Sequence, residues 1–175
     1  MKSIFESAKQ LTPELISIRR TLHQYPEIGS ILPRTQSFVF SKLEEYGYCP
    51  QKICESAVIA TISGKQPGKT ILLRADMDAL PIEEAAPVPF ASENGYMHAC
   101  GHDMHTTMLL GAAKLLKQYQ QDLVGTVKLI FQPDEEGFTG AKAMLKAGVL
   151  ENPHVDAGIA FHVVSGIPSG TIMCG

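Results

Sequence analysis

Residues 97–105, with the sequence MHACGHDMH, concentrate side chains that could bind a metal ion. They include three of the six histidines and one of the four cysteines of the chain. Thiolate and imidazole are ligands that Zn²⁺ and neighbouring divalent transition metals prefer. Cys100 and His102 are two residues apart, so in an extended segment both side chains leave the same face and can reach one metal cluster. We therefore place both residues before the start of the following helix.

Two adjacent carboxylates, Glu135 and Glu136, occur in the segment QPDEEG. Because neighbouring side chains do not easily point the same way, one can bind a metal while the other takes a proton from a water molecule. A metal ion lowers the pKa of bound water to about 7 in favourable cases. The pair therefore indicates the arrangement of a hydrolase.

Each of these signals also has an ordinary structural explanation when it is taken alone. A buried cysteine is usually inert, and an acidic pair is typical of a solvated turn. Asp76 and Asp78 suit a turn as well as a site. His162 alone is typical of a hydrogen-bonded core histidine. Only their convergence at one place in the fold favours a metal site.

The remaining histidines and cysteines give weaker signals. We interpret His98 and His105 as structural residues or as residues that support the ligands, and His105 could simply lie on the surface of its helix. His23 and His154 fall in predicted turns. The other cysteines are interpreted as small apolar fillers, at positions Cys49, Cys54 and Cys174.

The hydrophobic pattern predicts the elements that must position these residues. Apolar side chains recur at helical spacing in four segments, 3–22, 34–46, 103–120 and 139–148. In the first segment Pro13 begins the main helix, with Thr12 as its N-cap. Short apolar and β-branched segments predict strands at 57–63, 69–75, 125–132 and 155–163, with another beginning near 170. This alternation predicts an α/β domain with a mixed, largely parallel sheet and helices on both faces.

Three of the predicted strands are followed by carboxylates or imidazole. These residues are Asp76 and Asp78, Glu135 and Glu136, and His162. The carboxyl ends of parallel strands share one edge of an open sheet, and sites form at that edge. The segment with Cys100 and His102 lies at the start of the next helix. The sequence therefore predicts that all these side chains meet.

The composition limits the function classes. The chain has 175 residues, of which 45% are hydrophobic and 19% charged, and a net charge of −3. These values are typical of one ordinary globular domain. No basic run predicts nucleic-acid binding, and no apolar run approaches transmembrane length. Charged residues interrupt the N-terminal segment and no C-x-x-C pair occurs, so we expect no signal peptide, reduced thiols and a cytoplasmic location.

Five segments, in order along nearly the whole chain, resemble the metal-dependent N-acyl-amino-acid amidohydrolases. The segments are RRTLHQYPEIG, LRADMDALPIEE, MHACGHDMHTTMLLGAA, FQPDEEGFTGAKAM and GIAFHV. This family includes hippurate hydrolases, auxin-conjugate hydrolases and aminoacylase-like enzymes, within the larger aminoacylase and carboxypeptidase clan. The motifs HACGHD and EEG are specific when they occur together.

The resemblance implies a pair of divalent ions, usually zinc or manganese, with cobalt or nickel as alternatives. It implies that Cys100 bridges the ions, that His102 and Glu136 bind one, and that His162 binds the other. Glu135 matches the general base, and Asp78 matches an aspartate that orients the site. The implied reaction is attack of water on the amide carbonyl of a small N-acyl amino acid, which releases an acid and a free amino acid.

Members of the family continue into an inserted lid domain that supports dimerisation, and then return to the catalytic domain for a last histidine ligand. The resemblance therefore implies that residues 1–175 form the N-terminal portion of the catalytic domain. On this basis we expect weak or absent activity, an exposed apolar face, and homo-oligomers in the full-length relatives. Two alternatives stay open, a dipeptidase or carboxypeptidase of the same clan and a non-catalytic metal-binding or interaction module.

Overall fold

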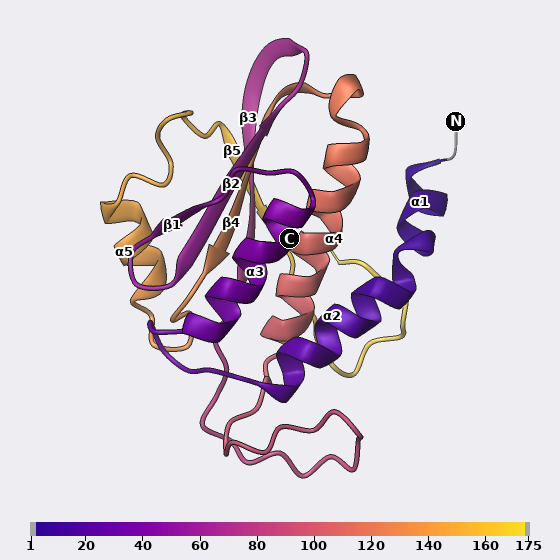
Figure 1. Cartoon of the computed structure of the whole chain (residues 1–175), viewed down its shortest axis with the longest axis vertical. Coiled ribbons are helices and arrows are strands. Elements are labelled where there is room, and N and C mark those ends of the chain that lie inside the picture. The colour runs from indigo at the N-terminus through magenta and orange to yellow at the C-terminus, as the bar shows by residue number, and fades with distance from the viewer. Residues whose placement is uncertain (1–2, 174–175) are drawn as a thin grey trace.

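A computed structural model describes residues 3–173, which form a five-stranded sheet with helices on both faces (Figure 1). The helices are α1 (Ile4–Gln10), α2 (Thr12–Gln24), α3 (Pro33–Glu45), α4 (His102–Gln118), the short 3₁₀ helix η1 (Gln120–Asp122) and α5 (Gly140–Lys146). The strands are β1 (Gln51–Ile53), β2 (Ala57–Ser63), β3 (Gln66–Asp76), β4 (Val124–Gln132) and β5 (Ala157–Ala160). The predicted α/β class is confirmed.

The sheet is mixed, with strand order β1-β2-β4-β3-β5. β3 lies in the middle of a parallel group, because it pairs in parallel with both β4 and β5. β2 pairs antiparallel with β1 and β4. Leu73 of β3 stands opposite Leu129 of β4 and Ile159 of β5. The three parallel strands therefore end at one edge of the sheet, as the sequence predicts.

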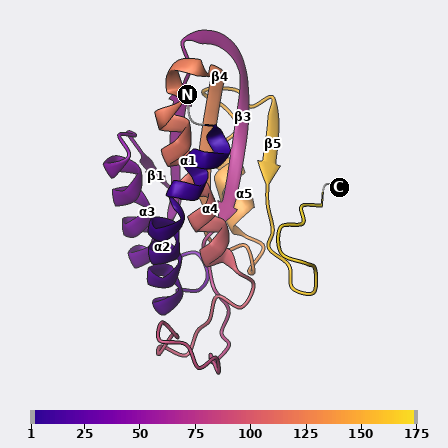
Figure 2. The ribbon, with the colours of Figure 1, turned by 90° about the vertical axis from the view of Figure 1, so that its right-hand side faces the viewer.

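The larger core lies between the sheet and the helices α2, α3 and α4. It contains fully or almost fully buried side chains from each of these elements, including Ile18, Val39, Leu43, Leu110, Leu129 and Phe131. Each such side chain contributes roughly 1.5–3 kcal/mol through its removal from water. The opposite face carries α5, whose Met144 packs with Leu72 and Ile130. The view in Figure 2 shows these layers on either side of the sheet.

Element boundaries differ from the predicted ones by a few residues. The main N-terminal helix begins at Thr12 with Pro13 in its first turn, but the N-cap position is Leu11, so the predicted cap is wrong. The last strand ends at Ala160, and His162 lies in the segment that follows it. Within the described residues no strand forms between 161 and 173. Cys174 lies outside the described residues.

A buried lysine holds the connection between α5 and β5. Lys128 of β4 is 2% exposed, and its ammonium group donates to three carbonyl oxygens. The acceptors are Val149, Glu151 and Pro153, at 2.9, 2.7 and 3.1 Å. These bonds compensate the cost of burying the charge. They also fix the backbone that leads into β5.

A long loop, residues 77–101, connects β3 to α4 and crosses the lower end of the molecule in Figure 1. Its only strand-like feature is the bridge between Leu80 and Met97. Two hydrogen bonds hold it to the segment that follows α2: Ala79 donates to the Glu27 carbonyl at 2.8 Å, and Asn94 donates to the Pro26 carbonyl at 2.8 Å. The loop therefore has a defined path although it is irregular.

Two surface features bear on the expectations from sequence. Apolar side chains are exposed on and after the edge strand β5, including Ile159 at 44% and Phe161 at 58%. Cys49 and Cys54 are exposed, so the prediction that they fill the core is wrong. No helix among the described residues combines the length and apolar character needed to cross a membrane.

Candidate metal centre

Two aspartates at the end of β3 form the base of the site. Asp76 and Asp78 are each 1% exposed, and Met77 between them is fully buried in the core. Residues two apart in an extended segment point to the same side, so both carboxylates face the start of α4. Asp78 accepts from the Nδ1 atom of His102 at 3.3 Å. Its second oxygen accepts from the backbone N–H of Glu136 at 3.0 Å, so one buried carboxylate fixes two parts of the site.

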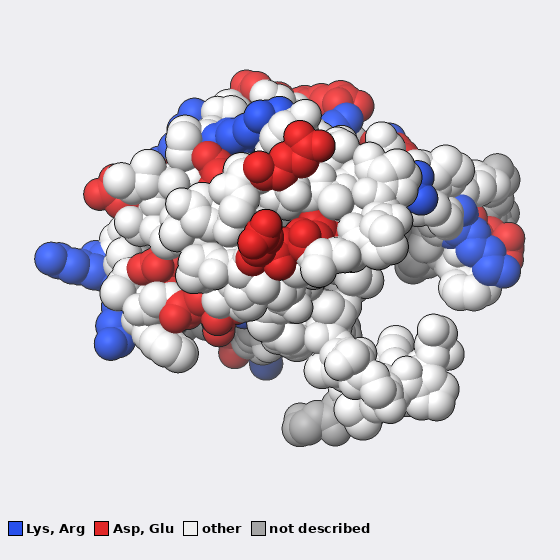
Figure 3. Space-filling view, turned by 90° about the horizontal axis from the view of Figure 1, so that it is seen from below, with Lys and Arg blue, Asp and Glu red and all other residues white. Residues whose placement is uncertain are grey.

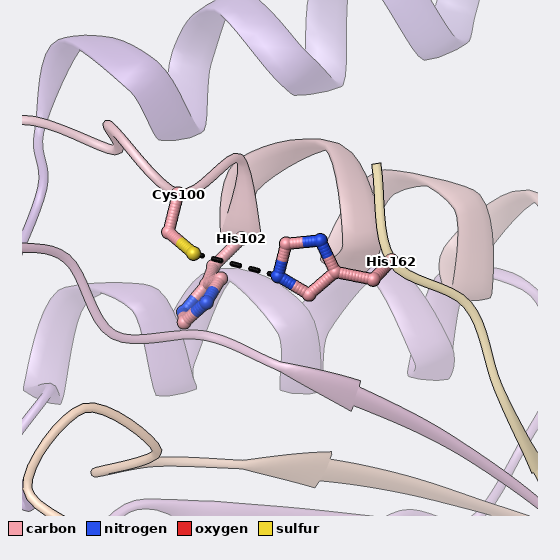
Figure 4. A group of neighbouring side chains, drawn as sticks. All are labelled: Cys100, His102 and His162. Carbon is pink, nitrogen blue, oxygen red and sulfur yellow. Dashed lines mark hydrogen bonds between the residues drawn. The ribbon is translucent and has the colours of Figure 1, made fainter. Parts of the chain in front are cut away.

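The start of α4 brings Cys100 and His102 to the site. Cys100 precedes the helix, but His102 is its first residue, so the prediction that both residues precede the helix is wrong for His102. Gly101 between them has φ +82°, a left-handed conformation that favours glycine and turns the chain into the helix. The Sγ atom of Cys100 lies 3.4 Å from Nε2 of His162, which comes from the segment after β5. Figure 4 shows the thiol and both imidazoles converging from these two segments. His102 is 1% exposed, whereas His162 lies at the surface.

The acidic pair lies in the turn that follows β4. Oε1 of Glu136 lies 3.7 Å from Nε2 of His102, and Oε2 of Glu135 lies 3.9 Å from the same nitrogen. The two glutamate side chains are 28% and 35% exposed, so both reach the surface while facing the buried imidazole. The predicted convergence is therefore present in the structure: the glutamates, Cys100, His102 and His162 share one edge of the sheet.

Three groups of side chains offer donor atoms within 4.8 Å of one another, the spacing needed to hold a metal ion. They are Cys100, His102 and His162; His102, Glu135 and Glu136; and Asp76, His102 and His105. His102 belongs to all three. Its buried Nε2 atom and the buried Oε1 atom of Glu136 have no hydrogen-bond partner in the described part of the chain. Buried polar atoms are normally satisfied, so this pair fits a cation between them.

The imidazole orientations also fit metal binding. Nδ1 of His162 donates to the Val163 carbonyl at 2.6 Å, and Nδ1 of His102 faces Asp78. Each ring therefore turns its Nε2 lone pair toward the site. Metal-binding histidines are commonly held in this way, with the other ring nitrogen donating to a carboxylate or a carbonyl.

The electrostatics of the site favour a cation. Burial, with the nearby carboxylates of Glu136, Glu135 and Asp76, raises the pKa of the Cys100 thiol to about 11. Burial disfavours protonation of His102, but the bond to Asp78 and the charge of Asp76 outweigh it, and the pKa of His102 is raised. Both shifts reflect the excess of negative charge, which a divalent ion would neutralise while deprotonating the thiol. In the view from below, Figure 3, acidic side chains lie near the middle of this end and also along its rim, where basic side chains lie beside them.

Three further histidines are buried, and for two of them, His23 and His105, a placement considered from the sequence is wrong. His105 is 2% exposed, so its placement on a helix surface is wrong; it contacts Asp76 and supports the segment with His162. His23 lies buried in α2, not in a turn, and pairs with Asp103. His98 is also buried, neither ring nitrogen has a partner in the described residues, and burial lowers its pKa to about 4. His154 lies in a turn, as predicted.

The spacing of His105 in the sequence indicates that it lies beside His102. It is three residues after His102 on the same helix, so both rings lie on one face of α4, with ring centroids 5.3 Å apart. The partners of His23 are 61 and 80 residues away in the chain, and no local pattern indicates them.

Comparisons with known proteins agree with this geometry. Residues 72–175 match the family described as Peptidase family M20/M25/M40. The chain is 46% identical over 164 residues to an N-acetyl-L-cysteine deacetylase of Bacillus subtilis, covering 93% of this chain and 39% of the relative. It is 41% identical over 175 residues to thermostable carboxypeptidase 1 of Saccharolobus solfataricus, covering 97% and 44%.

A solved structure from Bacillus subtilis, described as a dinuclear metal binding peptidase of the M20 family, superposes with a TM-score of 0.87 at 42% identity. The match covers 91% of this chain and 45% of that one. The chain thus spans less than half the length of each of these three relatives. The family match extends over more than half of the chain and includes the cysteine, the histidines and the glutamates of the site. The chain belongs to peptidase family M20/M25/M40.

Proposed function

We propose that this protein is a metal-dependent amidohydrolase that cleaves the amide bond of N-acyl amino acids, releasing a carboxylic acid and a free amino acid. The observation that carries the proposal is the pair of buried, unpartnered atoms, Nε2 of His102 and Oε1 of Glu136, in a cluster that also holds a thiol. The deacetylase relative supports the substrate class. The assignment of residues 1–175 to a metallohydrolase catalytic domain, and a cytoplasmic location, are parts of the same proposal.

The ligand roles follow from the donor groups. Cys100 would lie between two ions, His102 and Glu136 would hold one, and His162 would hold the other. Thiolate, imidazole and carboxylate together suit zinc or manganese, with cobalt or nickel as alternatives. When bound, such ions polarise a carbonyl group and lower the pKa of water.

Two residues of the chain would handle protons and orientation. Glu135 faces the same buried nitrogen as Glu136 and is partly exposed, so its carboxylate can reach a water molecule and accept its proton. The same carboxyl can then deliver this proton to the leaving nitrogen of the amide. Asp78 orients both His102 and the turn that carries Glu136.

Two other functions remain as alternatives. The carboxypeptidase relative favours a dipeptidase or carboxypeptidase, which would use the same proton transfer on a peptide bond. A non-catalytic metal-binding module would use the ligands without Glu135. Assembly into homo-oligomers through a lid domain is part of the proposal for the longer relatives.

The test compares the wild-type chain with Glu135→Gln, after metal removal by chelation and reloading with Zn²⁺ or Mn²⁺. Bound metal is measured by mass spectrometry, and hydrolysis is measured on N-acetyl and N-benzoyl amino acids and on dipeptides. We expect two ions in both proteins and a loss of about 10²–10⁴-fold in hydrolysis for the variant, the usual contribution of a general base. Glu44→Gln, an exposed residue of α3, is the matched control.

Each other result has a defined meaning. Unchanged hydrolysis in Glu135→Gln would remove the proposed base. Preference for dipeptides would favour the peptidase alternative. We expect weak or absent hydrolysis by residues 1–175 alone, so the assay is repeated with the C-terminal half of a relative supplied. Metal binding without hydrolysis even then would favour the non-catalytic module. Absence of metal binding would reject the whole proposal.

A further inference from the structure

The third donor group, Asp76, His102 and His105, has metal-binding distances but differs from the other two groups. We propose that His105 is a positioning residue and not a metal ligand, and that with Asp76 it clamps the segment carrying His162 against α4. The role of His162 as a ligand comes from the proposed function. The clamp itself is a property of the metal-free chain.

The hydrogen bonds of His105 determine where its proton lies. The backbone N–H of Val163 donates to Nε2 of His105 at 2.9 Å. A backbone N–H can only donate, so Nε2 must carry the lone pair. Nδ1 then carries the proton and donates it to Asp76 at 2.6 Å. Both ring nitrogens are occupied, and a metal ion on either would break one of these two bonds.

The other end of the clamp is anchored in the sheet. The second oxygen of Asp76 pairs with the Arg74 guanidinium at 2.7 Å, and the Asp76 carbonyl accepts from the Thr106 hydroxyl at 2.8 Å. Arg74 in turn donates to the side chain of Gln132 on β4 at 3.0 Å. A continuous line of polar contacts therefore runs from β4 through β3 and α4 to the backbone of Val163.

The segment that carries His162 needs this support because its own strand is weak. β5 is an edge strand of four exposed residues that pairs only with β3, and it ends two residues before His162. In Figure 2 the chain beyond β5 leads away from the sheet. Without a further contact, little in the strand would fix the imidazole of His162 beside Cys100.

A second contact at Val163 supports the clamp independently. A Cβ atom on Gly101 would lie 2.4 Å from Cγ2 of Val163, so the valine side chain packs directly on the glycine between Cys100 and His102. The rings of His105 and His162 are also in contact, with centroids 4.5 Å apart. The start of α4 thus holds residues 162 and 163 by a hydrogen bond, a ring contact and a packing contact.

Two amide variants separate the two bonds of His105. In His105→Gln the side-chain oxygen can reach the former Nε2 position and accept from Val163, whereas in His105→Asn the shorter side chain reaches only the Asp76 side. We expect the Val163 amide of the metal-free protein to exchange with solvent roughly fivefold to tenfold faster in His105→Asn than in wild type, the effect of one lost hydrogen bond. His105→Gln should stay close to wild type. His154→Asn, an exposed histidine in a turn, is the control.

Metal binding gives the second measurement. We expect His105→Asn to bind one of two Zn²⁺ ions about 10–100-fold more weakly, the usual effect of losing an outer partner of a ligand, and His105→Gln to retain both. Equal loss of an ion in both variants, with unchanged exchange at Val163, would show that His105 is itself a ligand and would overturn the proposal.

The tautomer of His105 can be measured on the wild-type protein, so this test does not depend on whether a variant folds. Nitrogen NMR of the metal-free protein should find the His105 proton on Nδ1, and the ring resonances should keep this pattern when Zn²⁺ is added. A proton on Nε2 would overturn the clamp. Because the tautomer and the Val163 exchange are measured without metal or substrate, a failure of the proposed hydrolase function would leave both results intact.

Discussion

His102 and Asp103 are neighbours in the first turn of α4, yet they belong to two different polar clusters. The open cluster contains Cys100, His102, Glu135, Glu136 and His162. The closed cluster contains Arg19, His23, Glu84 and Asp103. Both clusters have buried ionisable groups at their centre. In the open cluster, however, Nε2 of His102 and Oε1 of Glu136 lie 3.7 Å apart, beyond hydrogen-bond distance, and neither atom has a hydrogen-bond partner in the described chain.

The closed cluster satisfies its imidazole and its carboxylates with protein atoms. His23 contacts Asp103 through Nδ1 at 2.7 Å and Glu84 through Nε2 at 2.8 Å. Asp103 also pairs with Arg19 at 2.9 Å, and Glu84 accepts from the backbone of Ser92 at 2.6 Å. These contacts join α2, α4 and the loop 77–101. The cluster therefore ties three segments together and needs no ligand.

The contrast between the two clusters separates buried charged groups that stabilise the fold from those that could bind a ligand. Groups that find partners within the chain stabilise its tertiary structure. Groups that remain unpaired cost stability in the free protein and are retained where a ligand compensates them. Substitutions in the open cluster should therefore change metal binding, whereas substitutions in the closed cluster should change the free energy of unfolding.

The largest effect is expected for Cys100→Ala. This change removes the thiol that faces both imidazoles, so affinity for divalent ions should fall by more than the roughly 100-fold that loss of an outer partner costs. Titration calorimetry with Zn²⁺ measures the affinity, and chemical unfolding in chelator measures the stability. Cys49→Ala, at an exposed cysteine, should bind as the wild type does. Wild-type affinity in Cys100→Ala would place the metal elsewhere.

Asp103→Asn should give the largest loss of stability. It leaves the buried His23 and the guanidinium of Arg19 without their common carboxylate, and breaking a buried pair in this way costs about 3–5 kcal/mol. Urea unfolding of the metal-free protein measures the loss, with Asp122→Asn in the exposed helix η1 as control. A loss below about 1 kcal/mol would contradict the division into two clusters.

The same contrast explains what could be predicted from the sequence. Strand β2 is predicted to the residue, and the meeting of the strand ends follows from hydrophobic pattern and parallel topology alone. The candidate metal ligands can be recognised in the sequence because cysteine and histidine are rare residue types. Some of them, such as Cys100 and His102, are also close together in the chain. The proximity of His23 to Asp103 is not visible, because the partners are 80 residues apart and each residue alone suits an ordinary surface position.

The pH dependence of stability gives a smaller test of the closed cluster. The hydrogen bond to Asp103 raises the pKa of His23, although burial opposes it. Its stabilising effect is therefore fully present below pH 6.5, the ordinary pKa of histidine, and is lost as the pH rises through the raised value. Burial alone would raise the pKa of Asp103, but the bond to His23 keeps it lowered, so this carboxylate stays charged throughout.

We therefore expect the difference in unfolding free energy between the wild type and His23→Gln to shrink by roughly 1.5–3 kcal/mol between pH 6 and pH 9, the usual size of a hydrogen bond to a charged group. Urea unfolding at several pH values checks this expectation. His154→Gln, at an exposed histidine, should show no such trend. A difference that grows with pH would mean that His23 is neutral in the folded protein.

The smallest expected effect is a gain in stability, and it concerns Glu136. Four carboxylates face the open cluster, and the raised pKa of Cys100, due to burial and then to Glu136, reflects their negative potential. Glu136→Gln removes one of these charges, so in chelator it should stabilise the protein by up to about 1 kcal/mol, or about 2–4 °C in Tm. In saturating Zn²⁺ the wild type should become the more stable of the two proteins, because bound metal stabilises only a protein that can bind it. Glu44→Gln should show neither change. A loss of stability in chelator as large as that of Asp103→Asn would mean that the Glu136 carboxylate stabilises the metal-free fold. The open cluster would then not be a metal site whose charges are unpaired in the free protein.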